Sequence, residues 1–375
     1  MIAPGNWLGV LGGGQLGMLF TRAAQGMGYR VMAVDPDPHC PAAPLADRFV
    51  NLPLDAPGAL AALRDTCAAV TVETENAPAA TLTALAAHCQ VSPAGAAVAV
   101  AQDRIREKRF IAGLGLALVP FAAIEQAGDL VAARAELLPG VLKRSRYGYD
   151  GKGQALVHTP DELVAAYAGF GGVPCVLERK VALRLELSVL LARDAAGRTA
   201  LWPVVENQHV NGILDMSIAP ARIDAELARR ACDDALRIAA ALEYRGVLCV
   251  EFFVDAAGDL LVNEIAPRPH NSGHFTLDAC RCSQFEQQVR SLAGLPLGDP
   301  AMHKAAVMQN LLGNLWVHGE PDWRAATDPS TCLHLYGKAQ ARPGRKMGHY
   351  TCVAGSVEEA LQRARSVKAG LMRTR

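Results

Sequence analysis

The chain has 375 residues, of which 51% are hydrophobic and 20% charged, and its 37 basic residues balance 37 acidic ones. This composition is typical of a globular protein of two or three domains. Because no global field attracts nucleic acid or anionic lipid, we expect neither a nucleic-acid partner nor a membrane surface.

The cysteines and the N-terminus bear on the cellular compartment. The ten cysteines are scattered without a C-x-x-C pair, so we expect free, mostly buried thiols in a reducing cytoplasm. The opening residues, MIAPGNWLGVLGGG, lack the basic flank and long apolar core of a signal peptide. Residues 76–102 carry no Asp, Glu, Lys or Arg, but they are too rich in alanine for a membrane span.

The first hundred residues show a βαβ pattern. Apolar runs near 7–11, 30–34, 69–73 and 91 alternate with helix-compatible segments near 15–28, 57–66 and 79–88, which predicts a parallel sheet with covering helices. After the first run, the turn Gly12-Gly13-Gly14-Gln15-Leu16-Gly17 fits G-x-G-x-x-G, and Asp35 ends the next run. Taken alone, this fingerprint predicts a dinucleotide site.

A charged helix, QDRIREKRFIAGLG, follows near residue 103 and ends at Gly113 and Gly115. A small α/β segment then carries the loop LKRSRYGYDGKGQALV. Its three glycines within residues 148–153 permit close backbone approach to phosphates, and Lys143 at the end of the preceding strand can reach the same phosphates. An ordinary surface loop is the competing interpretation.

Beyond residue 175 the pattern changes to closely spaced strands. Strands at 175–181, 185–193 and 199–206, followed by a helix at 224–242, predict an antiparallel sheet in an α+β domain. The tail carries YGKAQARPGRKMGHY and a helix near 356–368.

The hairpin VLCVEFFVDAAGDLLVNEIAPR is the most informative segment. A turn centred between Ala257 and Gly258 makes Glu251 the cross-strand partner of Glu264, with Cβ atoms roughly 5 Å apart. Two facing carboxylates beside apolar residues indicate a cation between them, and oxygen ligands suit Mg²⁺, with Mn²⁺ as an alternative. The competing interpretation is a solvated pair on an exposed face, and a register slip of one residue would separate the pair. With the glycine-rich flap, the hairpin supplies what phosphoryl transfer from ATP requires.

The order of GGGQLG, QDR, GYDGKGQ, NEIAPRPHNSGH, SQFEQ and RPGRKMGH resembles that of ATP-grasp enzymes. Within that superfamily it is similar to the N(5)-carboxyaminoimidazole ribonucleotide synthases of purine biosynthesis. The resemblance implies a mixed α/β and α+β chain with an ATP-grasp fold. A Rossmann-like preATP-grasp domain would span 1–102 and a small lid domain 103–177. The C-terminal ATP-grasp domain would span 178–375, with an appended tail from about 300.

The resemblance also implies a reaction. ATP would phosphorylate bicarbonate, and 5-aminoimidazole ribonucleotide would be carboxylated through carboxyphosphate or CO₂, giving ADP and phosphate. The glycine-rich turn would serve the ribonucleotide rather than NAD, with its helix N-terminus facing an anion. A homodimer in the cytoplasm is expected.

The family's functional residues can be carried over position by position. For ATP these are Arg104, Lys143, Gly148, Tyr149, Asp150, Gly151, Lys152, Gly153, Gln154, Glu178, Arg179, Lys180, Val181, Glu186, His209, Asn263 and Glu264. For the ribonucleotide they are Gln15, Glu73, Tyr149, Asp150, Arg268, His270, Asn271, Lys338 and Arg345. The metal ligands are Glu251 and Glu264, and the catalytic set is Lys143, Asp150 and Arg268.

Two features depart from related patterns. Many ATP-grasp enzymes have an asparagine two residues after the bridging glutamate, whereas Ala266 stands here, as in this family. Ser145-Arg146-Tyr147 replaces an expected Arg-Gly-rich lead-in.

Three other functions remain open at this stage. They are an NAD-dependent oxidoreductase, another ATP-grasp ligase such as a formate-dependent glycinamide ribonucleotide transformylase, and a nucleotide sensor without catalysis.

Overall fold

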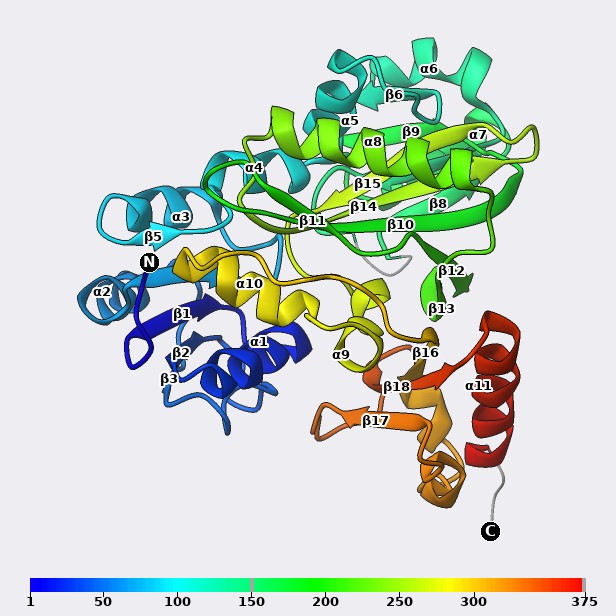
Figure 1. The fold of residues 1–375 in the computed structure, drawn as a ribbon. Coiled ribbons are helices and arrows are strands. Elements are labelled where there is room, and N and C mark those ends of the chain that lie inside the picture. The colour runs from blue at the N-terminus through cyan, green and yellow to red at the C-terminus, as the bar shows by residue number, and fades with distance from the viewer. Residues whose placement is uncertain (149–151, 373–375) are drawn as a thin grey trace.

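The computed structural model describes residues 1–148 and 152–372, and three sheets organise them (Figure 1). The N-terminal sheet has the strand order β3-β2-β1-β4-β5, and every neighbouring pair is parallel. The predicted βαβ pattern is therefore confirmed. The three-residue strand β3 was not predicted, because so short a segment carries no periodicity. The elements are β1 (Trp7–Leu11), α1 (Gln15–Gly26), β2 (Arg30–Val34), β3 (Arg48–Val50), α2 (Pro57–Thr66), β4 (Ala69–Val72), α3 (Ala79–Ala86) and β5 (Gln90–Val91).

A helix from much later in the chain packs against the N-terminal sheet and its helix α1. The helix α10 (Gln284–Ala293), which carries the SQFEQ motif, packs against α1 and puts Phe285 and Val289 into one core with Leu8. Figure 1 shows α10 lying along the N-terminal sheet. The N-terminal sheet is thus fixed directly to the C-terminal half.

The central sheet has the order β6-β9-β7-β8 and is antiparallel throughout. The prediction that residues 175–181 join the large C-terminal sheet was wrong, because β9 pairs with β6 and β7. Its Cys175 and Leu177 pack into the core of the central sheet. The expected domain boundary after residue 177 falls inside this strand. The elements are α4 (Gly95–Ala101), α5 (Arg104–Gly113), β6 (Phe121–Ile124), α6 (Asp129–Leu137), β7 (Gly140–Arg144), β8 (Gln154–Val157), α7 (Pro160–Gly169) and β9 (Cys175–Arg179).

The large sheet has nine strands in the order β15-β14-β10-β12-β13-β16-β18-β17, with β11 beside β10. Helix α8 covers one face, and α11 covers the strands of the tail (Figure 1). Because β13 pairs with β16, the tail extends this sheet. The elements are β10 (Leu183–Arg193), β11 (Thr199–Leu201), β12 (Val205–Val210), β13 (Ile213–Ala219), α8 (Ala225–Ala241), β14 (Gly246–Asp255), β15 (Leu260–Ala266), α9 (Thr276–Ala279), β16 (Ala305–Leu312), β17 (Thr331–Leu335), β18 (Lys346–Ala354) and α11 (Val357–Leu371).

Two bulk expectations can be compared with the structure. All ten cysteines are free thiols. Among the described helices, none combines the length and the apolar character that a bilayer crossing requires.

Candidate active site

A cavity of about 640 Å³ lies where the N-terminal sheet, α5, the flap and the large sheet meet. Residues from all of these parts line it, so no single domain contains the site. The residues singled out from the sequence that line it are Gln15, Glu73, Arg104, Lys143, Gly148, Lys152, Gln154, Glu186, His209, Glu251, Asn263, Glu264, Arg268, His270 and Asn271. Tyr149, Asp150 and Gly151 lie outside the described residues.

The hairpin places two glutamates opposite each other in this cavity. The cross-strand pair Glu251–Glu264 is confirmed, but the uniform register expected from the turn was wrong. Near the turn Phe252 pairs with Val262, and a β-bulge at Asn263 then shifts the ladder by one residue. The buried pattern shows the same shift, because Val262 and Ile265 both enter the core beneath the sheet.

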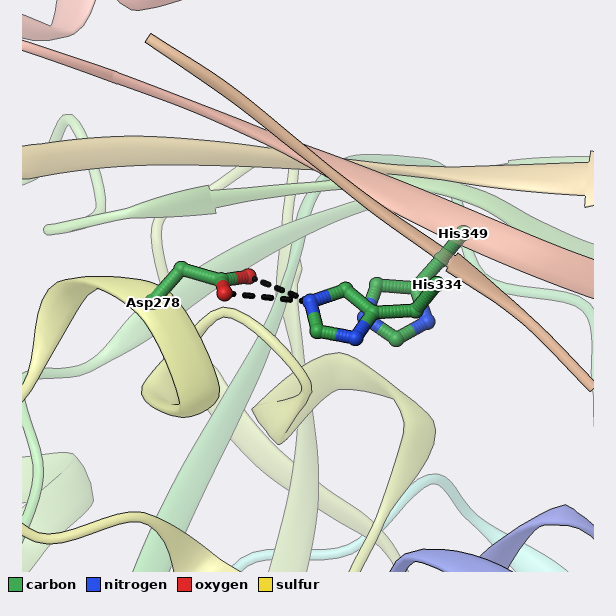
Figure 2. Close-up of side chains that lie close together, drawn as sticks. All are labelled: Asp278, His334 and His349. Atoms are coloured by element: carbon green, nitrogen blue, oxygen red, sulfur yellow. Dashed lines mark hydrogen bonds and ion pairs between the residues drawn. The ribbon is translucent and has the colours of Figure 1, made fainter. Parts of the chain in front are cut away.

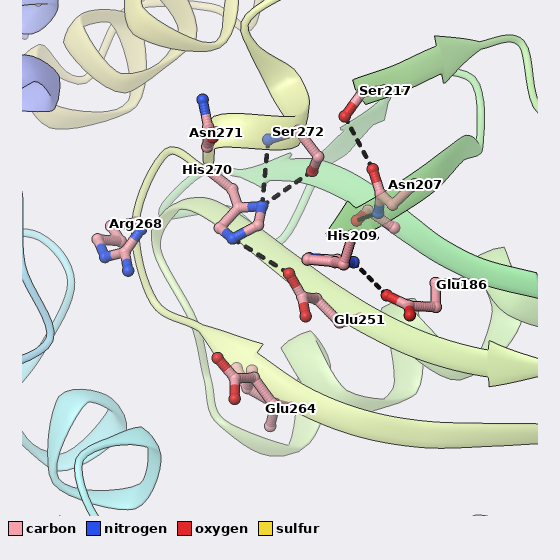
Figure 3. A network of polar contacts seen from close by, with 12 residues as sticks. Glu186, Asn207, His209, Ser217, Glu251, Glu264, Arg268, His270, Asn271 and Ser272 are labelled. Carbon is pink, nitrogen blue, oxygen red and sulfur yellow. Dashed lines mark hydrogen bonds and ion pairs between the residues drawn. The ribbon is translucent and has the colours of Figure 1, made fainter. Parts of the chain in front are cut away.

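The electrostatics of this pair suit a cation. Oε2 of Glu264 forms an ion pair with Nη1 of Arg104 at 2.6 Å. Oε1 of Glu251 lies 3.1 Å from Nε2 of His270 (Figure 3). Burial and the charge of Glu264 raise the pKa of Glu251 to about 7. Burial also opposes ionisation of Glu264, but Arg104 outweighs it and lowers the pKa of that carboxyl. The two partly buried carboxylates, in which the charge of Glu264 makes ionisation of Glu251 costly, form an oxygen donor set that fits a hard divalent ion.

A second charged group joins α5, β7 and β9. The carboxylate of Glu178 is shared by Nζ of Lys143 at 2.6 Å and Nζ of Lys108 at 3.0 Å. Despite burial, the two ammonium groups lower the pKa of Glu178 to about 2. Burial lowers the pKa of Lys143, because its one carboxylate partner is divided between two cations. Lys143, ion-paired with Glu178, lies at the wall of the cavity.

Of the other residues carried over for ATP, some line the cavity and some do not. Glu186 and His209 are paired on neighbouring strands (Figure 3), and that pairing outweighs burial and raises the pKa of His209. The described lining does not include Gly153, nor Glu178 and the residues that follow it, namely Arg179, Lys180 and Val181.

The glycine-rich turn already binds carboxylates of the chain itself. The amides of Gly14 and Gly17 donate to Glu73 at 2.7 Å, and the amide of Gly13 donates to Asp35 at 2.7 Å. A Cβ at Gly17 would lie 2.4 Å from the carbonyl oxygen of Gly12, which explains the glycine there. Burial raises the pKa of Glu73, although the two amides oppose this. The helix N-terminus that was expected to face a ligand anion is thus occupied by Glu73, which also argues against a dinucleotide pyrophosphate there.

The end of the cavity beside the glycine-rich turn is basic, and we call it the basic end. Arg268 is paired with Glu75, and Lys338 donates to Oε1 of Gln15 at 2.8 Å. Lys346 lines the cavity, whereas Arg345 does not and donates instead to the carbonyl of Gln340 at 3.1 Å.

Sequence reasoning missed several lining residues. Glu75 and Asn76 were not selected although they stand in the same segment as Glu73, and Lys346 was not selected although it follows Arg345 directly. Phe253 and Leu214 carried no signal, because apolar strand residues are ordinarily core.

A separate cluster of Asp278, His334 and His349 has the side chains of a metal site but not the geometry (Figure 2). Nε2 of His334 lies 3.0 Å from both oxygens of Asp278, and its ring stacks on His349 at 4.5 Å and 12°. Nitrogen lone pairs lie in the ring plane, so two stacked rings cannot converge on one ion. Nδ1 of His349 is bonded to the hydroxyl of Tyr336 at 2.8 Å. The cluster therefore joins β17 and β18 to α9.

Comparison with known proteins gives one consistent result. Residues 6–102 match the ribonucleotide synthetase preATP-grasp domain, 109–285 the ATP-grasp domain, and 306–363 the phosphoribosylaminoimidazole carboxylase C-terminal domain. The N5-carboxyaminoimidazole ribonucleotide synthase of Brucella melitensis is 42% identical over 93% of this chain and 97% of its own. That of Bacillus subtilis is 38% identical over 96% and 95%.

Solved structures agree with these relatives. The ADP complex of an N5-carboxyaminoimidazole ribonucleotide synthetase superposes with a TM-score of 0.92 at 38% identity, covering 98% of this chain and 97% of the other. The Aspergillus clavatus enzyme in complex with ADP and 5-aminoimidazole ribonucleotide gives 0.91 at 27%, covering 99% of both chains. The predicted ATP-grasp fold is confirmed.

Proposed function

Because the chain belongs to the family of N5-carboxyaminoimidazole ribonucleotide synthases, which are ATP-dependent ligases, we propose how its own residues divide the work of that reaction. The reaction is the carboxylation of 5-aminoimidazole ribonucleotide with bicarbonate, driven by conversion of ATP to ADP and phosphate. Bicarbonate is a poor electrophile, so the site must first favour its phosphorylation and then keep water away from the labile carboxyphosphate.

The single observation that carries the proposal is the facing pair of Glu251 and Glu264 inside a cavity also lined by Lys143 and Arg104. The two carboxylates would hold Mg²⁺, or Mn²⁺ in its place. When bound, such an ion offsets the negative charge that develops on the β- and γ-phosphate oxygens. Glu264 would exchange its contact with Arg104 for the ion, which releases the guanidinium toward the phosphates.

The flap and the lysines would position the triphosphate. Lys143 keeps its ammonium at the cavity wall through Glu178, and Lys152 lies on the same wall. Backbone amides of the glycine-rich flap add donors for phosphate oxygens. Asp150, which lies in the flap, would orient the exocyclic amine of the ribonucleotide and accept its proton.

The basic end would take the ribonucleotide phosphate. Lys338 and Lys346 bring two positive charges to this end, and Gln15 links Lys338 to the glycine-rich turn. Arg268 and His270 line the same cavity as the glutamate pair, and Figure 3 shows His270 beside Glu251, where the amine and the carboxyl group would meet. Arg345 remains a candidate for phosphate binding only through movement of its loop.

Two further expectations belong to this proposal. We expect a cytoplasmic enzyme, which the ten free thiols support, and a homodimer, as the family resemblance implies. A formate-dependent glycinamide ribonucleotide transformylase is not favoured, because the relatives and the C-terminal family match point to the carboxylating enzyme.

A coupled ADP assay tests the proposed function directly. ADP release should require both 5-aminoimidazole ribonucleotide and bicarbonate, and formate should not replace bicarbonate. Glu264→Gln should abolish turnover while leaving the circular dichroism spectrum unchanged. Near-normal turnover in this variant would refute the metal role of Glu264, and ADP release driven by formate would point to the transformylase.

A further inference from the structure

One face of α5 contacts three consecutive residues of β15. Arg104, Glu107 and Lys108 have the i, i+3, i+4 spacing that places side chains on one helix face. Nζ of Lys108 donates to the carbonyl of Asn263 at 2.9 Å, and Nη1 of Arg104 contacts the carboxylate of Glu264 at 2.6 Å. Oε1 of Glu107 accepts the amide of Ile265 at 2.6 Å. Each residue of the tripeptide 263–265 is thus held by one side chain of the helix.

These contacts fall on the β-bulge. Asn263 has no partner residue on β14, since Glu251 pairs with Glu264 and the adjacent Phe252 pairs with Val262. If the register near the turn continued without the bulge, Asn263 would oppose Glu251, and Glu264 would turn toward the core. The hairpin sequence therefore permits two ladders, and only the bulged ladder puts both glutamates into the cavity.

The polar ends of the Glu107 and Lys108 side chains are closed off from solvent. Glu107 is 1% exposed and Lys108 is fully buried, and burying charged groups is costly unless their hydrogen bonds are satisfied. Their hydrogen-bonding atoms meet the two backbone groups that flank Glu264, and Lys108 also meets Glu178. Apolar residues could fill the same volume but could not make these hydrogen bonds. We therefore assign the polar ends of Glu107 and Lys108 to the backbone of the bulge.

We propose that Glu107 and Lys108 are positioning residues that select the bulged register of β15 and so keep Glu264 opposite Glu251. This inference rests on the proposed metal role of the two glutamates. It predicts that Glu107, which has no place in the phosphate-binding set, controls the affinity for the divalent ion.

Glu107 allows the cleaner test, because Lys108 also contacts Glu178. Glu107→Met keeps the approximate volume and removes the acceptor for the Ile265 amide. Glu107→Gln is the matched control, because its amide oxygen can still accept that hydrogen bond. Binding of Mn²⁺ to the full chain with saturating ADP would be followed by the electron paramagnetic resonance signal of free Mn²⁺, with circular dichroism as a check on folding.

The expected result is a loss of Mn²⁺ affinity of about 10- to 100-fold in Glu107→Met, as is usual when the support of a metal ligand is removed. Glu107→Gln should stay within about threefold of wild type. Wild-type affinity in Glu107→Met would overturn the inference. If that variant does not fold, Glu107→Asp, with a carboxylate that is one methylene shorter, should bind Mn²⁺ more weakly than wild type, and equal affinity would overturn the inference.

The proposed metal site is tested separately by Glu264→Gln in the same titration. If Glu264→Gln loses Mn²⁺ binding while Glu107→Met does not, only the positioning role fails. If Glu264→Gln binds Mn²⁺ as wild type does, the metal site itself fails and the positioning role fails with it.

Discussion

Glu178→Gln tests how Lys108 and Lys143 are held by the one carboxylate that they share. The carboxylate is 3% exposed and lies between Lys143 and Lys108. Glutamine offers one acceptor oxygen and turns an NH₂ group toward the other ammonium, which leaves a buried cation uncompensated. A pKa lowered from 4.5 to about 2 corresponds to about 3 kcal/mol at neutral pH, within the range for breaking a buried ion pair.

Urea unfolding followed by circular dichroism measures this loss. We expect Glu178→Gln to lower the free energy of unfolding by about 3 kcal/mol at pH 7. The folded pKa lies below the unfolded value, so the stabilisation is present above pH 4.5 and is lost as the pH falls toward 2. The difference between wild type and variant should therefore shrink below pH 4.5. Glu125→Gln, which breaks an exposed pair with Arg109, is the control and should cost under about 0.5 kcal/mol. A loss in Glu178→Gln as small as that of the control would refute the reasoning.

Two further predictions concern the basic end and His274, a fully buried histidine whose ring lies 4.8 Å from that of His349. Lys338→Met should raise the KM for 5-aminoimidazole ribonucleotide about tenfold or more with a smaller change in kcat, because a charge that binds the substrate phosphate is lost. Lys304→Met, at an exposed position, is the control and should leave the KM unchanged. An unchanged KM in Lys338→Met would mean that Lys338 does not hold the phosphate. Burial lowers the pKa of His274 from 6.5 to about 3, so the unfolded state takes up a proton first and stability is lost as the pH falls below 6.5. Between pH 7.5 and 5.5 the stability advantage of wild type over His274→Gln should narrow by about 1 kcal/mol in urea unfolding; a constant difference would contradict the buried neutral state of His274.

The local parts of the fold were predictable from sequence. Strand and helix positions in the first hundred residues follow from hydrophobic periodicity. The pairing of β9 was not predictable, because its buried residues suit either sheet and only packing against Leu142 and Leu163 decides between them. The role of α10 in the N-terminal core is likewise a long-range contact.

In the hairpin β14–β15, the sequence predicted one pair of residues correctly but not the register of the strands. The expected pairing of Glu251 with Glu264 is right, but the expected uniform register is not. The pairs near the turn are offset by one residue, and the β-bulge at Asn263 restores the pairing of the two glutamates. The signal for the bulge was present, because the buried positions Leu260, Val262 and Ile265 break the two-residue period at Asn263. The contacts that Glu107 and Lys108 of α5 make with the backbone of β15 carried no comparable signal, since charged residues on a helix are ordinarily solvated.

The central claim is that Glu251 and Glu264 together grip a divalent ion beneath the triphosphate. Crystals of the protein grown with ADP and Mn²⁺ and measured at the manganese absorption edge test it most directly. We expect an anomalous peak about 2.1 Å from oxygens of both glutamates, the distance typical of Mg²⁺ ligands, with the phosphates of ADP on its other side. A peak that contacts neither carboxylate, or one that lies only at Asp278 and His334, would contradict it.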